Sequence, residues 1–216
     1  MLVDHFPLLG LRLRTPRLEL RLPSPGELSA LADLAAEGVH PPEVMPFAVP
    51  WTDRPPAEVA RGVVQHHWAE LAGVRPEEWS FSFAVFHGGV PVGVQTVGAR
   101  DLAITREVST GSWLGLRHQG KGIGTEMRAA VLHLAFEGLG AEAADSSAFE
   151  DNHASQAISR KLGYRPNGVG RRVIRGGAAV ELRMRLTRDD WERHRATPVT
   201  IEGLDPCLPL LGAAPA

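Results

Sequence analysis

One short segment limits the fold of this chain more than any other. Residues 114–125 read LGLRHQGKGIGT, a glycine-rich turn that follows a strand-like stretch and leads directly into a helical pattern. Glycines let successive backbone N–H groups point into one concavity, and the start of the helix adds the positive end of its dipole. The sequence therefore predicts a strand, a turn and a helix that together hold a pyrophosphate.

Two other classes of phosphate loop can be compared with these letters. A P-loop ends in Gly-Lys-Ser/Thr, but Lys121 is followed here by Gly122, so that pattern fails. A dinucleotide fingerprint is matched at Gly120 and Gly122, although Thr125 replaces its third glycine. Asp145 lies at about the distance expected for the ribose-binding acid, which leaves this alternative open. It is disfavoured because the preceding strands read as an antiparallel meander. A surface turn without a ligand is the third alternative.

The rest of the chain predicts an α+β fold. Alternating and β-branched runs predict strands, and leucines and alanines at helical spacing predict helices, the first with a capping box at Ser24 and Glu27. The predicted order is strand 17–22, helices from 24 and over 56–72, strands 79–86, 90–98 and 107–116, helix 122–138, strand 141–147, helix 154–162, strands 172–175 and 178–186, and a short helix from 187. This order predicts a mixed, mostly antiparallel central sheet flanked by helices.

Length and composition favour one domain followed by a tail. The chain has 216 residues, of which 44% are hydrophobic, enough for one full core. We expect the domain over residues 1–196 and the tail over residues 197–216. Val199 and Ile201 alternate with polar neighbours, as in a short edge strand, and leucines follow Cys207. Leucines are costly to leave in water, so the tail either folds over its own sheet or, as we favour, meets a neighbour in a homo-oligomer.

Charge and cysteine usage narrow the choice of partners. The net charge is -2 and no polybasic stretch is present, so neither nucleic acid nor a membrane surface is an expected partner. No apolar run reaches the ~20 residues of a membrane span, and the N-terminal pattern does not resemble a secretory signal. Cys207 is the only cysteine, which fits the cytoplasm. The adjacent His66 and His67 point apart on a helix, so no metal site is expected.

Two motifs in the correct order resemble those of the GNAT superfamily of acyltransferases. Residues 119–124, QGKGIG, match the pattern Q/R-x-x-G-x-G/A, and residues 151–164, DNHASQAISRKLGY, resemble the next motif of that family. The serine at Ser155 and the strand end at residues 113–115 resemble the ribosomal-protein N-acetyltransferase branch. Residues 45–51, MPFAVPW, resemble a loop of an actinobacterial subgroup. The layout from about residue 15 to about residue 190 fits the GNAT fold.

This resemblance implies an N-acyltransferase. It would move an acyl group, acetyl by default and succinyl as an alternative, from acyl-CoA to a primary amine on a small molecule or a protein. Transfer would occur by direct attack in a ternary complex, with acyl-CoA as co-substrate and without a metal. A non-catalytic acyl-CoA-binding or sensor domain is the main alternative, and a nucleotide-dependent oxidoreductase is less favoured.

The resemblance also assigns residues to the CoA site. Backbone amides of the glycine loop would bind the pyrophosphate, the end of the preceding strand would pair with the pantetheine arm, and Asn152 would bond the pantetheine amides. Arg160 or Lys161 would meet the nucleotide phosphates, or both are solvated surface charges. The residues expected to bind CoA are Leu114, Leu116, Gln119, Gly120, Lys121, Gly122, Ile123, Gly124, Thr125, Asn152, Ser155 and Arg160.

The catalytic groups are less clearly indicated. Many members of the family carry an acidic tyrosine seven residues after the asparagine, where this chain has Ser159. Ser155 lies one helical turn earlier and would stabilise the leaving thiolate, or it caps the helix. Glu107 could act as the base through a water molecule, Asp145 is equally open, and each could instead be a plain surface acid.

The proline-rich loop over residues 40–55 is the expected wall of the acceptor site. It is rigid and aromatic, and it follows the first main helix. Met45, Phe47 and Trp51 could instead fill the core, which is the favoured role for Phe47.

Overall fold

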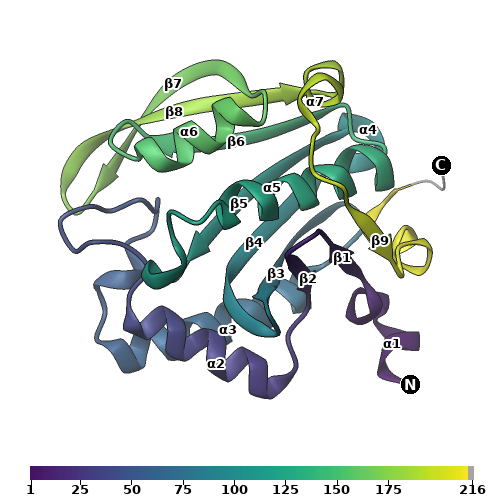
Figure 1. Cartoon of the computed structure of the whole chain (residues 1–216), viewed down its shortest axis with the longest axis horizontal. Helices are drawn as coiled ribbons and strands as arrows, with labels where there is room; N and C mark the ends of the chain where they lie inside the picture. The colour runs from purple at the N-terminus through teal and green to yellow at the C-terminus, as the bar shows by residue number, and fades with distance from the viewer. Residues whose placement is uncertain (214–216) are drawn as a thin grey trace.

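Nine strands of the computed structural model, which describes residues 1–213, form one sheet in the order β7-β8-β6-β5-β4-β3-β2-β1-β9 (Figure 1). The pairing of β5 with β6 is parallel, and the other pairings are antiparallel. The strands are β1 (Arg12–Arg14), β2 (Leu18–Arg21), β3 (Glu78–His87), β4 (Val90–Arg100), β5 (Glu107–Leu114), β6 (Ala143–Phe149), β7 (Arg165–Ile174), β8 (Gly177–Thr187) and β9 (Thr200–Glu202). The predicted α+β fold is confirmed.

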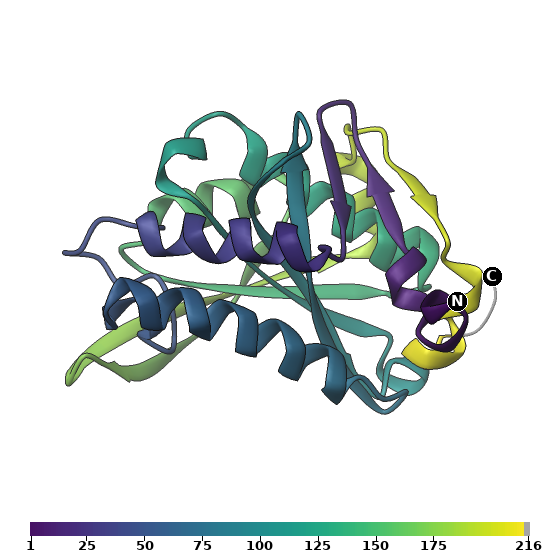
Figure 2. The ribbon, with the colours of Figure 1, turned by 90° about the horizontal axis from the view of Figure 1, so that it is seen from below.

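Helices cover both faces of this sheet. They are α1 (Leu2–His5), α2 (Pro25–Glu37), α3 (Pro56–Gly73), α4 (Leu102–Thr105), α5 (Ile123–His133), α6 (His153–Lys161) and α7 (Arg188–His194). Figure 1 shows α5 and α6 on one side of the sheet, and Figure 2 shows α2 and α3 side by side on the other. The helix predicted over 122–138 ends as an α-helix at His133 and continues as a wider π-turn over Leu134–Gly138. No helix within residues 1–213 has the length and apolar character needed to cross a membrane.

Side chains along β3 point alternately to the two faces of the sheet, and buried residues form a core layer on each face. Phe81, Phe83 and Val85 point into the main core, which also contains the apolar stripe of α5. Ala84 and Phe86 point to the other face and pack with the leucines of α2. The same period on β5 places Val108 and Leu114 in the main core and turns Trp113 toward α2. Side chains of β5 can therefore reach either face of the sheet.

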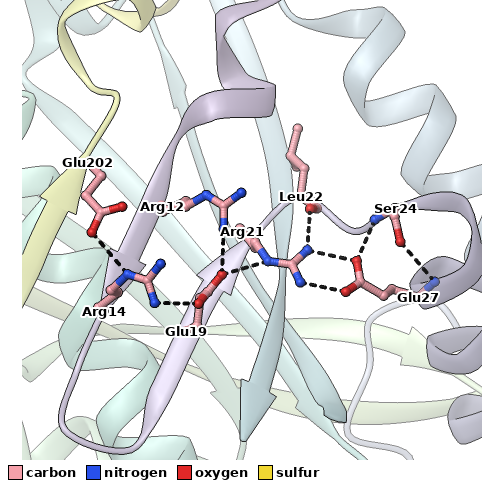
Figure 3. Close-up of polar contacts among 8 residues, drawn as sticks. All are labelled: Arg12, Arg14, Glu19, Arg21, Leu22, Ser24, Glu27 and Glu202. Atoms are coloured by element: carbon pink, nitrogen blue, oxygen red, sulfur yellow. Dashed lines mark hydrogen bonds and ion pairs between the residues drawn. The ribbon is translucent and has the colours of Figure 1, made fainter. Parts of the chain in front are cut away.

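A network of arginines and glutamates joins the first strands to α2 (Figure 3). Glu19 on β2 accepts hydrogen bonds from Arg12, Arg14 and Arg21, and Arg21 also pairs with Glu27 on α2. Glu27 Oε2 accepts from the backbone N–H of Ser24 at 2.8 Å, while Ser24 Oγ accepts from the N–H of Glu27 at 3.4 Å. The predicted capping box is therefore confirmed, and it is part of a larger charged network.

The tail predicted over residues 197–216 lies on the chain's own core as far as residue 213. Its strand β9 pairs with β1, and Cys207, Leu208 and Leu211 are buried in the main core. The indole N–H of Trp79 donates to the carbonyl of Leu211 at 2.9 Å. Burial within one chain removes the argument that the tail needs a neighbour. The homo-oligomer and the domain boundary stay predictions, and residues 214–216 lie outside the described part.

Candidate functional site

The two parallel strands separate to form a wedge. β5 pairs with β6 over three residues only, ending at Ser109 and Asp145. Beyond this point β5 remains paired with β4, and β6 remains paired with β8. The facing edges of residues 110–114 and 146–149 therefore have no strand between them. Backbone groups on such edges can pair with an extended ligand, as another strand would.

The predicted glycine turn closes the wide end of this wedge. Gly120 and Gly122 have φ angles of 72° and 78°, a region that glycine adopts without steric strain from a Cβ. A Cβ on Gly124 would lie 2.9 Å from Ile158 Cδ1, so glycine at this position lets α5 and α6 approach closely. The first N–H groups of α5 follow Gly122 directly and have no partners within the helix. This concave row of donors fits a pyrophosphate.

Gln119 has a role that the sequence did not predict. Its Nε2 donates to the carbonyl of Val39 at 2.7 Å and to that of Leu114 at 2.9 Å. The side chain thus anchors the glycine turn to the end of β5 and to the segment after α2. The resemblance had assigned Gln119 only through its backbone.

The start of α6 provides polar groups on the same side of the sheet. Asn152 is the N-cap, and its Oδ1 accepts from the backbone N–H of Ser155 at 3.1 Å. Asn152, not Ser155, therefore caps this helix, which corrects the capping alternative for Ser155. Ser159 is 2% exposed and its hydroxyl accepts from Arg128 at 2.9 Å. Of the two serines, Ser155 is the one that faces open space.

A cavity of about 730 Å³ joins both faces of the sheet through the wedge. It is lined on one side by the glycine turn and the start of α6, and on the other by residues of the loop over 40–48. Most of the residues assigned to CoA line it, namely Leu114, Gln119, Gly120, Gly122, Gly124, Thr125, Asn152 and Ser155. Residues from both faces of the sheet therefore line one cavity.

Four other assigned residues lie outside the lining of this cavity. Ile123 is buried in the main core, and Leu116 is 43% exposed in a short turn. Lys121 is exposed, and its Nζ donates to the carbonyl of Arg117. Arg160 is exposed as well. Its neighbour Lys161 instead lines a smaller cavity of about 330 Å³ beside Gly122, together with Arg17, His194 and Arg195.

The two acids considered as bases lie in a different place. Glu107 and Asp145 both face Arg185, and they line a second cavity of about 610 Å³ with Glu70 of α3. The guanidinium of Arg185 lowers the pKa of Glu107, whereas burial raises the pKa of Asp145 despite the same neighbour. Neither acid lines the cavity that contains Ser155.

Sequence reasoning missed Glu181, an acid that does line the main cavity. This residue of β8 is 5% exposed. Its Oε1 accepts from Ser147 Oγ at 3.1 Å and from Arg172 Nε at 2.9 Å, while Oε2 lies 3.9 Å from Arg183 Nε. Register places Glu181 opposite Phe149, near the wide end of the wedge. Its carboxylate is held in place and retains the capacity to accept a further hydrogen bond.

The loop after α2 bounds the far side of the cavity. Phe47 lines the cavity and packs on Trp51 with ring centroids 5.1 Å apart, while Met45 is buried. Phe47 thus packs against buried residues and also lines this cavity, and its role as a wall of the acceptor site stays a prediction. Arg175, at the turn between β7 and β8, forms an ion pair with Asp53 and donates to the carbonyl of Pro42 at 3.0 Å. The hairpin and the loop thus meet beside the cavity.

Within the part of the chain that the structure describes, no three His, Cys, Asp or Glu side chains come together in a way that could hold a metal ion.

Comparisons with known proteins agree with this geometry. The sequence profile of the acetyltransferase (GNAT) domain matches residues 17–165. A GCN5-related N-acetyltransferase from Brucella melitensis has a TM-score of 0.66 at 18% identity, covering 85% of this chain and 81% of that chain. RimJ of Mycobacterium smegmatis, in complex with CoA-disulfide, has a TM-score of 0.64 at 19% identity, covering 85% and 90%. RimL, a ribosomal alpha-N-protein acetyltransferase in complex with coenzyme A, has a TM-score of 0.61 at 19% identity, covering 82% and 97%.

These structures share the fold, and the profile covers more than half of the sequence. The chain belongs to the GNAT family of acetyltransferases and is an acyl-CoA-dependent N-acyltransferase.

Proposed function

We propose that this enzyme transfers an acetyl group from acetyl-CoA to a primary amine by direct attack, with both substrates meeting in the wedge. The observation that carries the proposal is that one cavity has the glycine turn and Ser155 on one side and Glu181 on the other. Bringing both reactants into one cavity turns a bimolecular step into an effectively intramolecular one.

The CoA side follows from the donors on that face. We assign the pyrophosphate to the glycine turn and the pantetheine arm to the open edge of β5, with the side-chain amide of Asn152 alongside. Arg17 and Lys161 line the small cavity next to Gly122, so they are better placed than Arg160 for the nucleotide phosphates. Phosphate groups favour such a site because cations and a helix N-terminus lie together.

The amine side follows from Glu181. An amine attacks only when it is neutral, and the attack leaves an extra proton on its nitrogen. We assign the removal of this proton to the carboxylate of Glu181, a buried acid in the lining of the cavity. When the carbon–sulfur bond breaks, its electron pair goes to the CoA sulfur, and the Ser155 hydroxyl donates a hydrogen bond to the thiolate that forms.

The acceptor is a primary amine carried by a protein or a small molecule. It enters past the loop over residues 40–48 and the hairpin that contacts this loop through Arg175. RimL acts on a ribosomal protein, which makes peptides with a free N-terminus the first acceptors to test. We place the reaction in the cytoplasm, because both the use of acyl-CoA and a free thiol at Cys207 fit that reducing compartment.

The test is turnover with a panel of amines. We expect acetyl-CoA to give free CoA thiol and an acceptor heavier by one acetyl group, detected by mass spectrometry, with succinyl-CoA as the competing donor. Binding of acyl-CoA without turnover of any amine would favour a sensor domain instead. Thermal stabilisation by NAD but not by CoA would favour an oxidoreductase.

Glu181→Gln tests the assigned base. Glutamine keeps the shape of the side chain but cannot take a proton, so kcat/KM should fall by about 10²- to 10⁴-fold while the Kd of acetyl-CoA stays the same. Glu58→Gln, on the exposed start of α3, is the matched control. Unchanged kcat/KM in Glu181→Gln would exclude Glu181 as the base.

A further inference from the structure

A buried arginine lies at the CoA side of the wedge without an anionic partner. Arg128 of α5 is 3% exposed, and its Nη1 donates to the hydroxyl of Ser159 at 2.9 Å. Its Nε is buried, and no acceptor among residues 1–213 lies within hydrogen-bonding distance of it. No carboxylate in that part of the chain forms an ion pair with this guanidinium either. Buried charges are normally paired, because an unpaired ion in a protein interior is costly.

The position of Arg128 connects it to the reacting end of the wedge. Arg128 lines the main cavity together with Thr110, the first residue of β5 beyond its last pairing with β6. The hydroxyl of Thr110 lies 3.4 Å from that of Tyr164, which is buried. Burial raises the pKa of the Tyr164 phenol, and the nearby charge of Arg128 opposes this effect only in part. The phenol is therefore neutral at ordinary pH and does not serve as the counterion of Arg128.

Ser159 adds a second indication. It occupies the position at which many GNAT enzymes carry a tyrosine that protonates the leaving thiolate. In this chain the serine is too short to fill that role, and its hydroxyl is used as an acceptor for Arg128. Of these two residues, Arg128 is the one that lines the cavity.

We propose that Arg128 is a catalytic residue that stabilises the thiolate of CoA as it leaves. This inference rests on the proposed function and adds a residue to it. The amine nitrogen forms a bond to the carbonyl carbon, the carbon–sulfur bond breaks, and its electron pair remains on sulfur as a thiolate facing the guanidinium. Arg128 keeps its proton, the amine proton goes to Glu181, and the thiolate takes a proton from water after release.

A carboxylate at the end of a succinyl group is another anion that could approach an arginine. The far side of the cavity, into which the acyl group extends to meet the amine, carries Glu181. A succinyl carboxylate extending there would lie across the sheet from α5, beside Glu181 and its partner Arg172 rather than beside Arg128. The thiolate is the anion that forms on the same side of the sheet as Arg128.

The first experiment uses the wild-type enzyme and measures the thiol pKa of bound CoA. The ultraviolet absorbance of the thiolate is followed from about pH 6 to about pH 10, around an ordinary thiol pKa of about 8.5. We expect the pKa to fall by about one to three pH units, the effect of a nearby opposite charge. Between the pKa of the bound thiol and that of the free thiol, the affinity for CoA should then rise about tenfold for each pH unit. Desulfo-CoA lacks the thiol, so its affinity should not change with pH in this way.

Variants then assign the effect to the guanidinium. Arg128→Met should return the bound thiol to its ordinary pKa and lower kcat by about 10²- to 10³-fold, with the Kd of desulfo-CoA unchanged. Arg128→Lys, which keeps the charge, should restore part of the pKa shift. Arg61→Met, on the exposed surface of α3, is the matched control and should change neither quantity.

The outcomes separate this inference from the proposed function. Equal, pH-independent binding of CoA and desulfo-CoA to the wild-type enzyme would overturn the role of Arg128 and leave the CoA site intact. A loss confined to succinyl-CoA in Arg128→Met would overturn it as well, in favour of acyl selection. Failure of the wild-type enzyme to bind either compound would overturn the CoA site itself and this inference with it.

Discussion

Among single residues, Ser155 and Ser159 illustrate how one helical turn separates two functions. Both serines lie on α6, but Ser159 is buried against Arg128, whereas Ser155 lines the cavity with its hydroxyl uncommitted to the helix cap. A serine hydroxyl is a weak acid. Ser155 can therefore stabilise a forming thiolate by donating a hydrogen bond, but it is poorly suited to protonate one.

Ser155→Ala tests this role. Removal of a donor that acts mainly as charge develops should lower kcat by about 10²-fold with little change in the Kd of acetyl-CoA. The helix should remain intact because Asn152 supplies its cap. Ser29→Ala, on the exposed face of α2, is the control, with stopped-time assays of thiol release as the measurement. Full turnover in Ser155→Ala would contradict a catalytic role for this hydroxyl.

Among the elements, the start of α2 depends on one carboxylate that performs two tasks. Glu27 closes the capping box with Ser24 and pairs with Arg21 of β2, so it fixes the helix to the sheet (Figure 3). The hydrogen bond from Arg21 lowers the pKa of Glu27 to about 2. The Glu27 carboxyl therefore binds a proton less tightly in the folded state than in the unfolded chain. As a result, Glu27 stabilises the fold when the pH is above the ordinary carboxyl pKa of about 4.3.

This stabilisation should be lost as the pH falls from about 4.3 through the folded pKa of about 2. Glu27→Gln should lower the free energy of unfolding by about 1–2 kcal/mol at neutral pH, allowing for solvent screening of a partly exposed pair. The difference between the variant and the wild type should shrink in acid. Urea titrations at neutral and acidic pH measure both effects, with Glu43→Gln, in an exposed loop, as the control. A difference that does not depend on pH would contradict the assigned cause.

The sequence predicted those elements whose signals are local and long. The capping box of α2, the hairpin of β3 and β4 and the glycine turn before α5 each have a pattern that needs no knowledge of the rest of the fold. The elements α1, β1 and α4 contain only three or four residues, and such short segments form because the surrounding chain holds them. Periodicity gives no signal for them.

The site residues also differ in whether a local sequence motif indicates them or only the folded chain brings them together. The glycine turn and Asn152 were found because their motifs are contiguous, whereas Glu181 joins the cavity only through the register between β6 and β8. Two signals were present nonetheless. Alternation in β8 places Glu181 on the polar face with Arg183, and Arg128 shares the buried stripe of α5 with Val131 at helical spacing. A charge within an apolar stripe is unusual enough to mark a residue for attention.

Across the whole molecule, the two ends of the chain complete one edge of the sheet together. The N-terminal strand β1 pairs on one side with β2 and on the other with β9, which follows the last helix. Arg14 of β1 also donates to Glu202 of β9 at 3.0 Å. The C-terminal segment therefore covers an edge that would otherwise be open for pairing with another chain. If the enzyme assembles as the predicted homo-oligomer, the edge of β1 does not form the contact, because β9 occupies it.

The last prediction concerns a chain that ends at Arg195. This truncation removes β9 together with Cys207, Leu208 and Leu211, and it uncovers Trp79, whose indole would lose its bond to Leu211. A fully buried large apolar side chain contributes about 1.5–3 kcal/mol, so the free energy of unfolding should fall by about 5 kcal/mol, a large share of the 5–15 kcal/mol typical of a domain. Leu211→Ala in the full-length chain, expected to cost about 2–5 kcal/mol, tests the same packing without removing the strand. Urea unfolding of all three proteins, with their masses measured by sedimentation, checks the prediction. Equal stability of the shortened and full-length chains would show that the segment contributes nothing to the core, whatever their oligomeric state.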